Sequence, residues 1–165
     1  MILVECYVDV ALIRALGFRE VRHEENKPAV IEELRKYAGG GSNMVGLVDE
    51  DPGSPWPKYF GSFSRIATSG HGFSTWVGPG GNIYIVVLQP RHEEWIYNVA
   101  RRCGIDVREY GLPGDWRSFH SRLHGGMRIR ERILRPYVNL LEEMLEQECN
   151  ALIELKAELS KLLRR

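Results

Sequence analysis

Short apolar runs alternate with helix-like segments in the N-terminal part of the chain. Continuous apolar runs predict buried strands at 1–8 and 43–48, and residues 19–24 are expected to form a short, partly exposed strand between them. Apolar residues at helical spacing, each set followed by glycine, predict helices at 10–16 and 29–38. Strands that alternate with helices in this way are typical of right-handed crossovers and a parallel sheet.

The alternation of strands and helices stops after the third predicted strand. Residues 51–57 contain three prolines and a glycine, which cannot continue a helix or a central strand, so a loop is expected there. Beyond it, apolar runs at 73–77 and 83–88 flank a glycine-rich turn and predict a hairpin. A helix is expected at 91–102, because a proline precedes it and a glycine follows it.

The C-terminal segment favours helix throughout, and its apolar positions recur at alternating spacings of four and three. Only Glu148 interrupts this heptad pattern. The apolar positions are Leu134, Val138, Leu141, Leu145, Leu152, Leu155, Leu159 and Leu162. Two interpretations follow: a homodimer formed through the C-terminal helix, or a helix that folds back along its own sheet.

The expected fold class is α/β, with a mostly parallel central sheet flanked by helices and a long C-terminal helix. Residues 105–127 are rich in glycine and aromatic side chains and show no clear period. We therefore divide the chain into an α/β domain at 1–104, an irregular segment at 105–127 and a helical extension at 128–165.

The composition is that of a globular protein of 165 residues, long enough to bury a substantial core. Basic and acidic side chains are equal in number, 22 each, so net charge predicts no partner. Cys6, Cys103 and Cys149 are too widely spaced for a zinc pair, and a disulfide framework is not expected. No leader pattern and no long apolar run occur, which predicts a cytoplasmic protein without a membrane partner.

Acidic residues stand at the ends of two predicted strands. Glu5 follows the start of the first run, and Asp49 and Asp51 follow the third. If these strands are neighbours in a parallel sheet, their carboxyl ends meet at the edge where open α/β sheets bind ligands. Three carboxylates there would repel one another unless a cation joined them, and oxygen ligands of this kind suit Mg²⁺ or Mn²⁺.

Two segments carry a family resemblance. The run from Leu3 to Asp9 (LVECYVD), followed by the run from Gly46 to Gly53 (GLVDEDPG), resembles the Toprim domain of topoisomerases, primases and related nucleases. The resemblance covers about residues 1–100 and implies a Toprim-like Rossmannoid fold. It also implies that Glu5, Asp49 and Asp51 are catalytic and bind the metal. Family members usually have glycine after the glutamate, where this chain has Cys6.

A third segment is similar to the smaller, defence-related branch of this superfamily, which includes the overcoming-lysogenization-defect nucleases. Residues 90–96 (PRHEEWI) resemble the segment of that branch in which an acidic residue precedes tryptophan and faces the metal. The resemblance implies that Glu93 or Glu94 completes the metal site, with Glu94 preferred because it adjoins Trp95. Asp9 is a further candidate ligand, although its position is more typical of a helix cap.

Arginines are concentrated near the start of the C-terminal segment. Arg117, Arg122, Arg128, Arg130, Arg132 and Arg135 occur with only one acid, Glu131, between the first and the last. Guanidinium groups bind phosphate oxygens in pairs, so these arginines are candidate nucleic-acid ligands. The alternative is a solvated helix face that pairs with acids of a partner chain. His120 and His124 are four residues apart, which would permit a metal pair on a helix, but the preceding glycines and proline favour a loop.

Together these features predict Mg²⁺-dependent phosphodiester chemistry on nucleic acid, most simply nuclease-type hydrolysis at an acidic site. The alternative is a non-catalytic Toprim-like module that binds nucleic acid or protein in a larger defence or repair assembly. A third and weaker alternative is a phosphatase or nucleotide-processing enzyme that acts on a small substrate.

Overall fold

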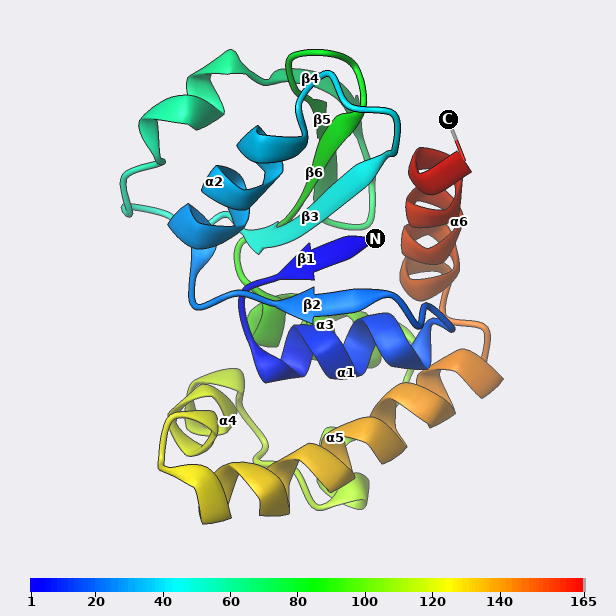
Figure 1. Cartoon of the computed structure of the whole chain (residues 1–165). Coiled ribbons are helices and arrows are strands. Elements are labelled where there is room, and N and C mark those ends of the chain that lie inside the picture. Colours follow the sequence, from blue (N-terminus) through cyan, green and yellow to red (C-terminus); the bar gives the residue numbers. More distant parts are fainter. Residues whose placement is uncertain (165) are drawn as a thin grey trace.

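The computed structural model describes residues 1–164 and shows an α/β fold built on one six-stranded mixed sheet (Figure 1). The strand order is β2-β1-β3-β6-β5-β4. Four neighbouring strands are parallel: β2 (Val21–His23), β1 (Ile2–Val4), β3 (Met44–Asp49) and β6 (Ile83–Leu88). The remaining two, β5 (Phe73–Val77) and β4 (Ser64–Thr68), are antiparallel. The expected α/β class, the parallel strands and the hairpin are therefore confirmed.

Helices cover both faces of this sheet. Helix α2 (Lys27–Tyr37) packs on one face, where the core includes Leu3, Ile31 and Val48. Helices α1 (Tyr7–Ala15) and α3 (His92–Arg102) share the other core with Ile2 and Val4. Successive residues of β1 thus point to opposite faces, and both faces are buried, as the continuous apolar runs predict.

The first strand is shorter than predicted, because a helix begins soon after it. Strand β1 ends at Val4, and Cys6 is the N-cap of α1. The backbone N–H of Cys6 donates a hydrogen bond to the Asp9 carboxylate at 3.0 Å, which satisfies one free donor of the helix start. Asp9 was expected to cap a helix that begins at Val10. The helix begins earlier, at Tyr7, so Asp9 caps it from inside its first turn.

Strand β4 lies between the expected loop at 51–57 and the predicted hairpin, and it was not predicted. All its residues are exposed, it lies at the edge of the sheet, and its pairing is irregular between Arg65 and Ala67. An edge strand of this kind has no apolar run by which the sequence could reveal it. The short 3-10 helix η1 (Lys58–Ser62) precedes it.

The segment 105–127, expected to be irregular, contains a 3-10 helix and an α-helix. These are η2 (Val107–Tyr110) and α4 (Trp116–Leu123). The Asp115 carboxylate caps α4 by accepting the backbone N–H of Ser118 at 2.9 Å. Phe119 and Leu123 anchor the helix in the core, so the prediction of an irregular segment was wrong here.

The C-terminal segment is broken into two helices and does not form one long helix. Helix α5 (Met127–Glu146) ends before Glu148, which has a positive φ of 52°, and α6 (Asn150–Arg164) follows. Helix α6 lies against β3. Its leucines at 152, 155, 159 and 162 are fully buried. These heptad positions thus pack on the protein's own sheet, which is the fold-back interpretation.

The turn between α5 and α6 also carries a disulfide. Cys149 is bonded to Cys103 at the C-terminal end of α3, with the two Cα atoms 5.9 Å apart. The expectation of no disulfide was wrong, because the fold brings together cysteines that are 46 residues apart in the chain. Among the described helices, none is both long and apolar enough to cross a membrane.

Candidate functional site

The carboxyl edge of the parallel strands carries two linked carboxylates. Glu5 directly follows β1 and Asp49 ends β3, its parallel neighbour. The Glu5 carboxylate accepts the backbone N–H of Asp49 at 2.9 Å. Asp49 in turn accepts the backbone N–H of His92, the first residue of α3, at 2.9 Å. The side chains of two strand ends and the start of a helix therefore converge at one point, as expected for an α/β ligand site.

A buried polar chain lies beside these carboxylates. His92 Nδ1 is 2.6 Å from the Asp9 carboxylate, and His92 Nε2 is 2.6 Å from the hydroxyl of Tyr137 on α5. A neutral imidazole would donate to Asp9 and accept from the phenol. Asp9 also accepts the thiol of Cys6 at 3.0 Å. His92, Asp9 and Tyr137 are all buried, so α1, α3 and α5 are joined by one polar network next to Asp49.

The electrostatic environment of the edge is strongly negative. Burial, followed by the charge of Asp9, raises the pKa of Glu5 to about 8. Burial also raises the pKa of Asp49, and the charges of Asp9, Glu5 and Glu93 add to this effect. Partly buried carboxylates whose charges oppose ionisation within one cluster are the arrangement that a cation would stabilise.

Asp51 is held apart from this pair by a lysine. Its carboxylate lies 3.1 Å from Lys27 Nζ, which also donates to the carbonyl of Glu50 at 3.1 Å. Lys27 is only 6% exposed and packs over the ring of Trp56, 4.4 Å from the ring centroid. Its positive charge lowers the pKa of Glu5. Lys27 was not singled out in the sequence, although it opens the helix that follows β2 at this same edge.

The two candidate glutamates of α3 lie in different environments. Glu93 is 5% exposed, and its carboxylate is 3.0 Å from Nδ1 of His120 on α4. The charge of Glu93 also raises the pKa of Asp49. Glu94 is only half-buried. Glu93 is therefore the α3 carboxylate with an observed connection to the acidic edge.

Metal-ligand spacing favours a different set of residues from the predicted trio. Among residues 1–164, the ligand atoms of Glu93, His120 and His124 all lie within 4.8 Å of one another. Glu5, Asp49 and Asp51 do not form such a group in that part of the chain. Glu5 and Asp49 are thus brought together, whereas Asp51 faces Lys27.

A small cavity of about 70 Å³ lies beside Glu93, among residues of α1, α4 and α5. Glu93, Cys6, His124 and Arg130 are among its lining residues. The guanidinium of Arg130 also lies over the ring of Tyr7, 4.5 Å from the ring centroid. A positive side chain therefore stands within the same cavity as a buried carboxylate.

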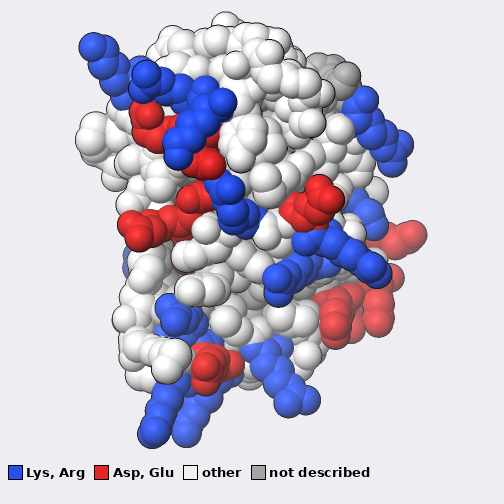
Figure 2. Space-filling view, in the orientation of Figure 1, with Lys and Arg blue, Asp and Glu red and all other residues white. Residues whose placement is uncertain are grey.

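The arginines predicted to contact phosphate lie on α4 and the first half of α5. Figure 2 shows basic side chains over the lower part of the molecule, where Figure 1 places these two helices. Arg130 is half-buried, and the other five are exposed: Arg117, Arg122, Arg128, Arg132 and Arg135. We call these six residues the arginine face. Most of its side chains are free to reach a ligand in solvent.

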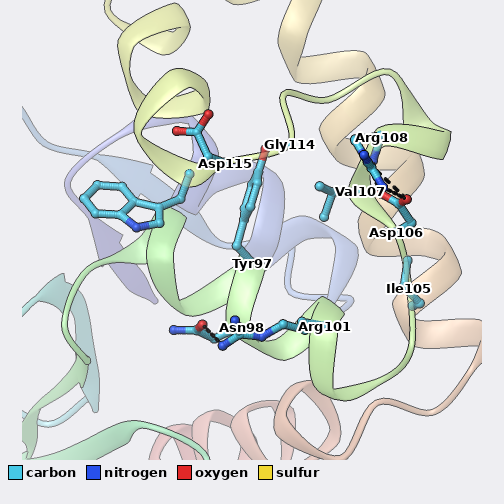
Figure 3. Close-up of a pocket in the computed structure, with 10 residues that line it drawn as sticks. Tyr97, Asn98, Arg101, Ile105, Asp106, Val107, Arg108, Gly114 and Asp115 are labelled. Atoms are coloured by element: carbon cyan, nitrogen blue, oxygen red, sulfur yellow. Dashed lines mark hydrogen bonds and ion pairs between the residues drawn. The ribbon is translucent and has the colours of Figure 1, made fainter.

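A larger cavity of about 420 Å³ lies elsewhere, between the C-terminal half of α3, η2 and the start of α4 (Figure 3). Its polar groups are already paired. Arg108 binds Asp106 at 2.7 Å, and the hydroxyl of Tyr97 donates to the carbonyl of Pro113 at 2.7 Å. Because no buried charges converge there, the acidic edge is the better candidate site.

No protein-family model, no curated protein and no solved structure matches this chain. The functional argument therefore rests on the geometry of the site.

Proposed function

We propose that the acidic edge binds Mg²⁺ or Mn²⁺ and that the protein uses this ion to hydrolyse phosphodiester bonds in nucleic acid, as the resemblance to Toprim domains implies. One observation carries the proposal. Glu5 and Asp49 lie half-buried side by side at the carboxyl ends of parallel strands, and the charge of Glu5, together with those of Asp9 and Glu93, raises the pKa of Asp49. Binding a cation removes this repulsion.

The donor set fits such an ion. Glu5 and Asp49 offer only carboxylate oxygens, which are the ligands that Mg²⁺ and Mn²⁺ prefer. When bound, the ion would activate water and stabilise charge on the phosphate. Lys27 supplies a fixed positive charge at the same edge. The raised pKa of Glu5, about 8, favours its protonated form at neutral pH in the protein without metal, so binding of the ion would release this proton.

Nucleic acid is the proposed substrate because of the arginine face. Guanidinium groups bind phosphate oxygens bidentately, and several arginines on adjacent helices can follow a phosphate backbone. Arg130 lines the same cavity as Glu93, and the charge of Glu93 raises the pKa of Asp49 at the acidic edge. A backbone bound by the arginines would therefore lead towards the carboxylates.

The test is cleavage of labelled single- and double-stranded DNA and RNA with Mg²⁺, with Mn²⁺ and with chelator. We expect cleavage that requires the metal and disappears in Asp49→Asn. Asp106→Asn is the matched control, because the Asp106 side chain is 39% exposed and pairs with Arg108 on η2, outside the acidic edge. Full activity of Asp49→Asn, with normal folding confirmed by circular dichroism, contradicts the proposal.

A second candidate is a Toprim-like module that binds nucleic acid or protein without catalysis. Cys6 favours this candidate, because it stands where the family usually has glycine. Its thiol donates a hydrogen bond to the Asp9 carboxylate. The backbone of Cys6 is extended, with φ −147°, so glycine can replace it without strain. Cleavage that appears or rises in Cys6→Gly identifies an enzyme restricted by this side chain. Nucleic-acid binding by both proteins, with cleavage by neither, supports the binding module.

A homodimer through the C-terminal segment stays a prediction, and α5 is the helix now expected to form its interface. The α6 leucines are buried in the protein's own core, whereas Leu134 and Val138 on α5 are only half-buried. Both line an open groove between α5 and α1. Sedimentation of the wild type and of Val138→Glu tests this prediction: a dimer that dissociates in the variant supports it, and a monomeric wild type contradicts it.

A further inference from the structure

A cluster with nitrogen ligands lies next to the acidic edge and is chemically distinct from it. His120 and His124 are four residues apart at the C-terminal end of α4, so their rings lie on one side of the helix, with centroids 4.5 Å apart. Glu93 faces them from the first turn of α3. Two helices from distant parts of the chain thus present two imidazoles and one carboxylate to a common point.

We propose that Glu93, His120 and His124 bind a Zn²⁺ ion. Imidazole nitrogen and carboxylate oxygen are ligands that suit zinc, whereas Mg²⁺ prefers oxygen alone. A tetrahedral ion with bonds of about 2.0–2.2 Å places its ligand atoms about 3.3 Å apart. The three ligand atoms already lie within 4.8 Å of one another, so small side-chain rotations complete the geometry.

The site is of the open type. Three protein ligands leave the fourth zinc position free for water or a substrate atom, as in catalytic zinc sites. The cavity of about 70 Å³ contains Glu93 and His124 together with Arg130. This volume accommodates about two water molecules at roughly 30 Å³ each. A guanidinium at the wall of the cavity would favour an anionic fourth ligand, such as a phosphate oxygen.

The burial of the three ligands fits metal entry from solvent. Glu93 is buried at the inner side, the side chain of His120 is 42% exposed, and His124 is exposed. Without metal, the pair of Glu93 and His120 at 3.0 Å already fixes two of the three ligands. The third, His124, is the C-cap of α4, and its ring centroid lies 4.5 Å from that of His120. The fold without metal therefore already gathers all three ligands.

The test uses metal-free protein titrated with Co²⁺, as a visible probe of zinc sites, and then with Zn²⁺ in the presence of excess Mg²⁺. We expect one equivalent of Co²⁺ to give intense visible absorption, and Zn²⁺ to displace it while Mg²⁺ does not. His120→Ala and His124→Ala should each weaken binding by at least about tenfold. His71→Ala is the matched control, because His71 is a partly exposed histidine that pairs with Glu154.

The outcomes separate this inference from the proposed phosphodiester chemistry. Zinc binding that survives in Asp49→Asn but fails in His124→Ala supports the site whether or not the protein cleaves nucleic acid. His124 is exposed, so its replacement leaves the core intact. Equal zinc affinity in wild type, His120→Ala and His124→Ala, or no binding by the wild type, overturns the proposal and leaves Glu93 and His120 as a structural ion pair.

Discussion

The acidic edge and the arginine face carry opposite charges and are built in opposite ways. The carboxylates of Glu5 and Asp49 are half-buried and fixed by backbone hydrogen bonds. The arginines lie mostly in solvent on the surface of α4 and α5. The edge therefore has its geometry set by the fold, whereas the arginine face supplies charge without a fixed geometry. Substitutions at the edge should therefore have large and specific effects on stability and metal binding. Substitutions on the arginine face should have small effects that add up.

The largest effect on stability is expected from Lys27, the buried cation of the edge. Lys27→Met leaves the Asp51 carboxylate and its acidic neighbours without their counter-charge, which should lower the free energy of unfolding by about 3 kcal/mol. Urea denaturation measures this loss. Lys36→Met is the matched control: its amino group pairs with Glu33 in solvent, so stability should hardly change. Equal small losses of stability in both variants would show that the carboxylates of the edge do not depend on the charge of Lys27.

The next effect is a dependence of stability on pH, caused by Glu5. The pKa of Glu5 is about 8 in the folded protein against 4.5 as the ordinary value. Below pH 4.5 both states hold the proton, and as the pH rises towards 8 only the unfolded state releases it, so stability falls. Glu5→Gln removes this penalty and should gain about 2 kcal/mol over wild type at about pH 8, with little gain at about pH 4. Thermal unfolding in chelator at both pH values measures it.

The effect of added Mg²⁺ on stability should also differ between the wild type and Glu5→Gln. Mg²⁺ should stabilise the wild type at about pH 8, because the ion binds the ionised carboxylates of the folded state. Glu5→Gln should respond less, since it lacks one ligand. A pH profile that is identical in wild type and Glu5→Gln contradicts this account of the edge.

A smaller effect is expected from Tyr137, which supports the edge from α5. Tyr137→Phe removes the hydroxyl that is 2.6 Å from His92 Nε2 and leaves this buried nitrogen without its partner. The cost should be about 1–2 kcal/mol of stability, with weaker metal binding because His92 also positions Asp49. Tyr97→Phe, whose hydroxyl binds a loop carbonyl, is the control and should leave metal binding unchanged. Unchanged metal affinity in both variants would limit Tyr137 to a structural function.

The smallest single effects are expected on the arginine face. Arg128→Gln, Arg132→Gln and Arg135→Gln should each weaken nucleic-acid binding a few-fold without changing metal binding or folding. For duplex DNA, the slope of log affinity against log salt should become shallower by about 0.9 for each phosphate that the variant no longer neutralises. Fluorescence anisotropy at several salt concentrations measures it. Arg19→Gln is the control, because Arg19 is an exposed arginine before β2. An equal loss of affinity in Arg19→Gln would show that nucleic acid is not bound by the arginine face in particular.

The sequence predicted the acidic edge because its two carboxylates follow buried strands. Apolar runs locate β1 and β3, and parallel pairing necessarily brings Glu5 and Asp49 to the same edge. The network around Asp9 could not be predicted in the same way. Tyr137 reaches His92 only through the packing of α5, and no local pattern encodes a contact over that separation.

The position of Asp51 was also beyond the sequence pattern. Asp49 and Asp51 are two residues apart, which would place both on one side of a strand, but β3 ends at Asp49. Asp51 has a positive φ of 50° in the following turn, so its carboxylate meets Lys27. The pairing depends on where the strand ends, and strand ends are poorly fixed by local sequence.

The C-terminal helices illustrate a limit of periodicity. The heptad pattern continues through Glu148, yet the chain turns there and α6 folds back onto β3. Burial of the α6 leucines against the sheet, together with the link from Cys149 to Cys103, accompanies this turn. A regular apolar period identifies a buried helix face but does not identify the surface that covers it.

The most direct test of the central claim is calorimetric titration of Mg²⁺ and Mn²⁺ into the wild type, Asp49→Asn and Asp106→Asn at neutral pH. The account predicts binding to the wild type and to Asp106→Asn, with release of about one proton per ion because Glu5 is protonated in the free protein. It predicts that Asp49→Asn does not bind either ion. Equal binding to all three proteins, or binding to none, would contradict the claim that Glu5 and Asp49 form a cation site.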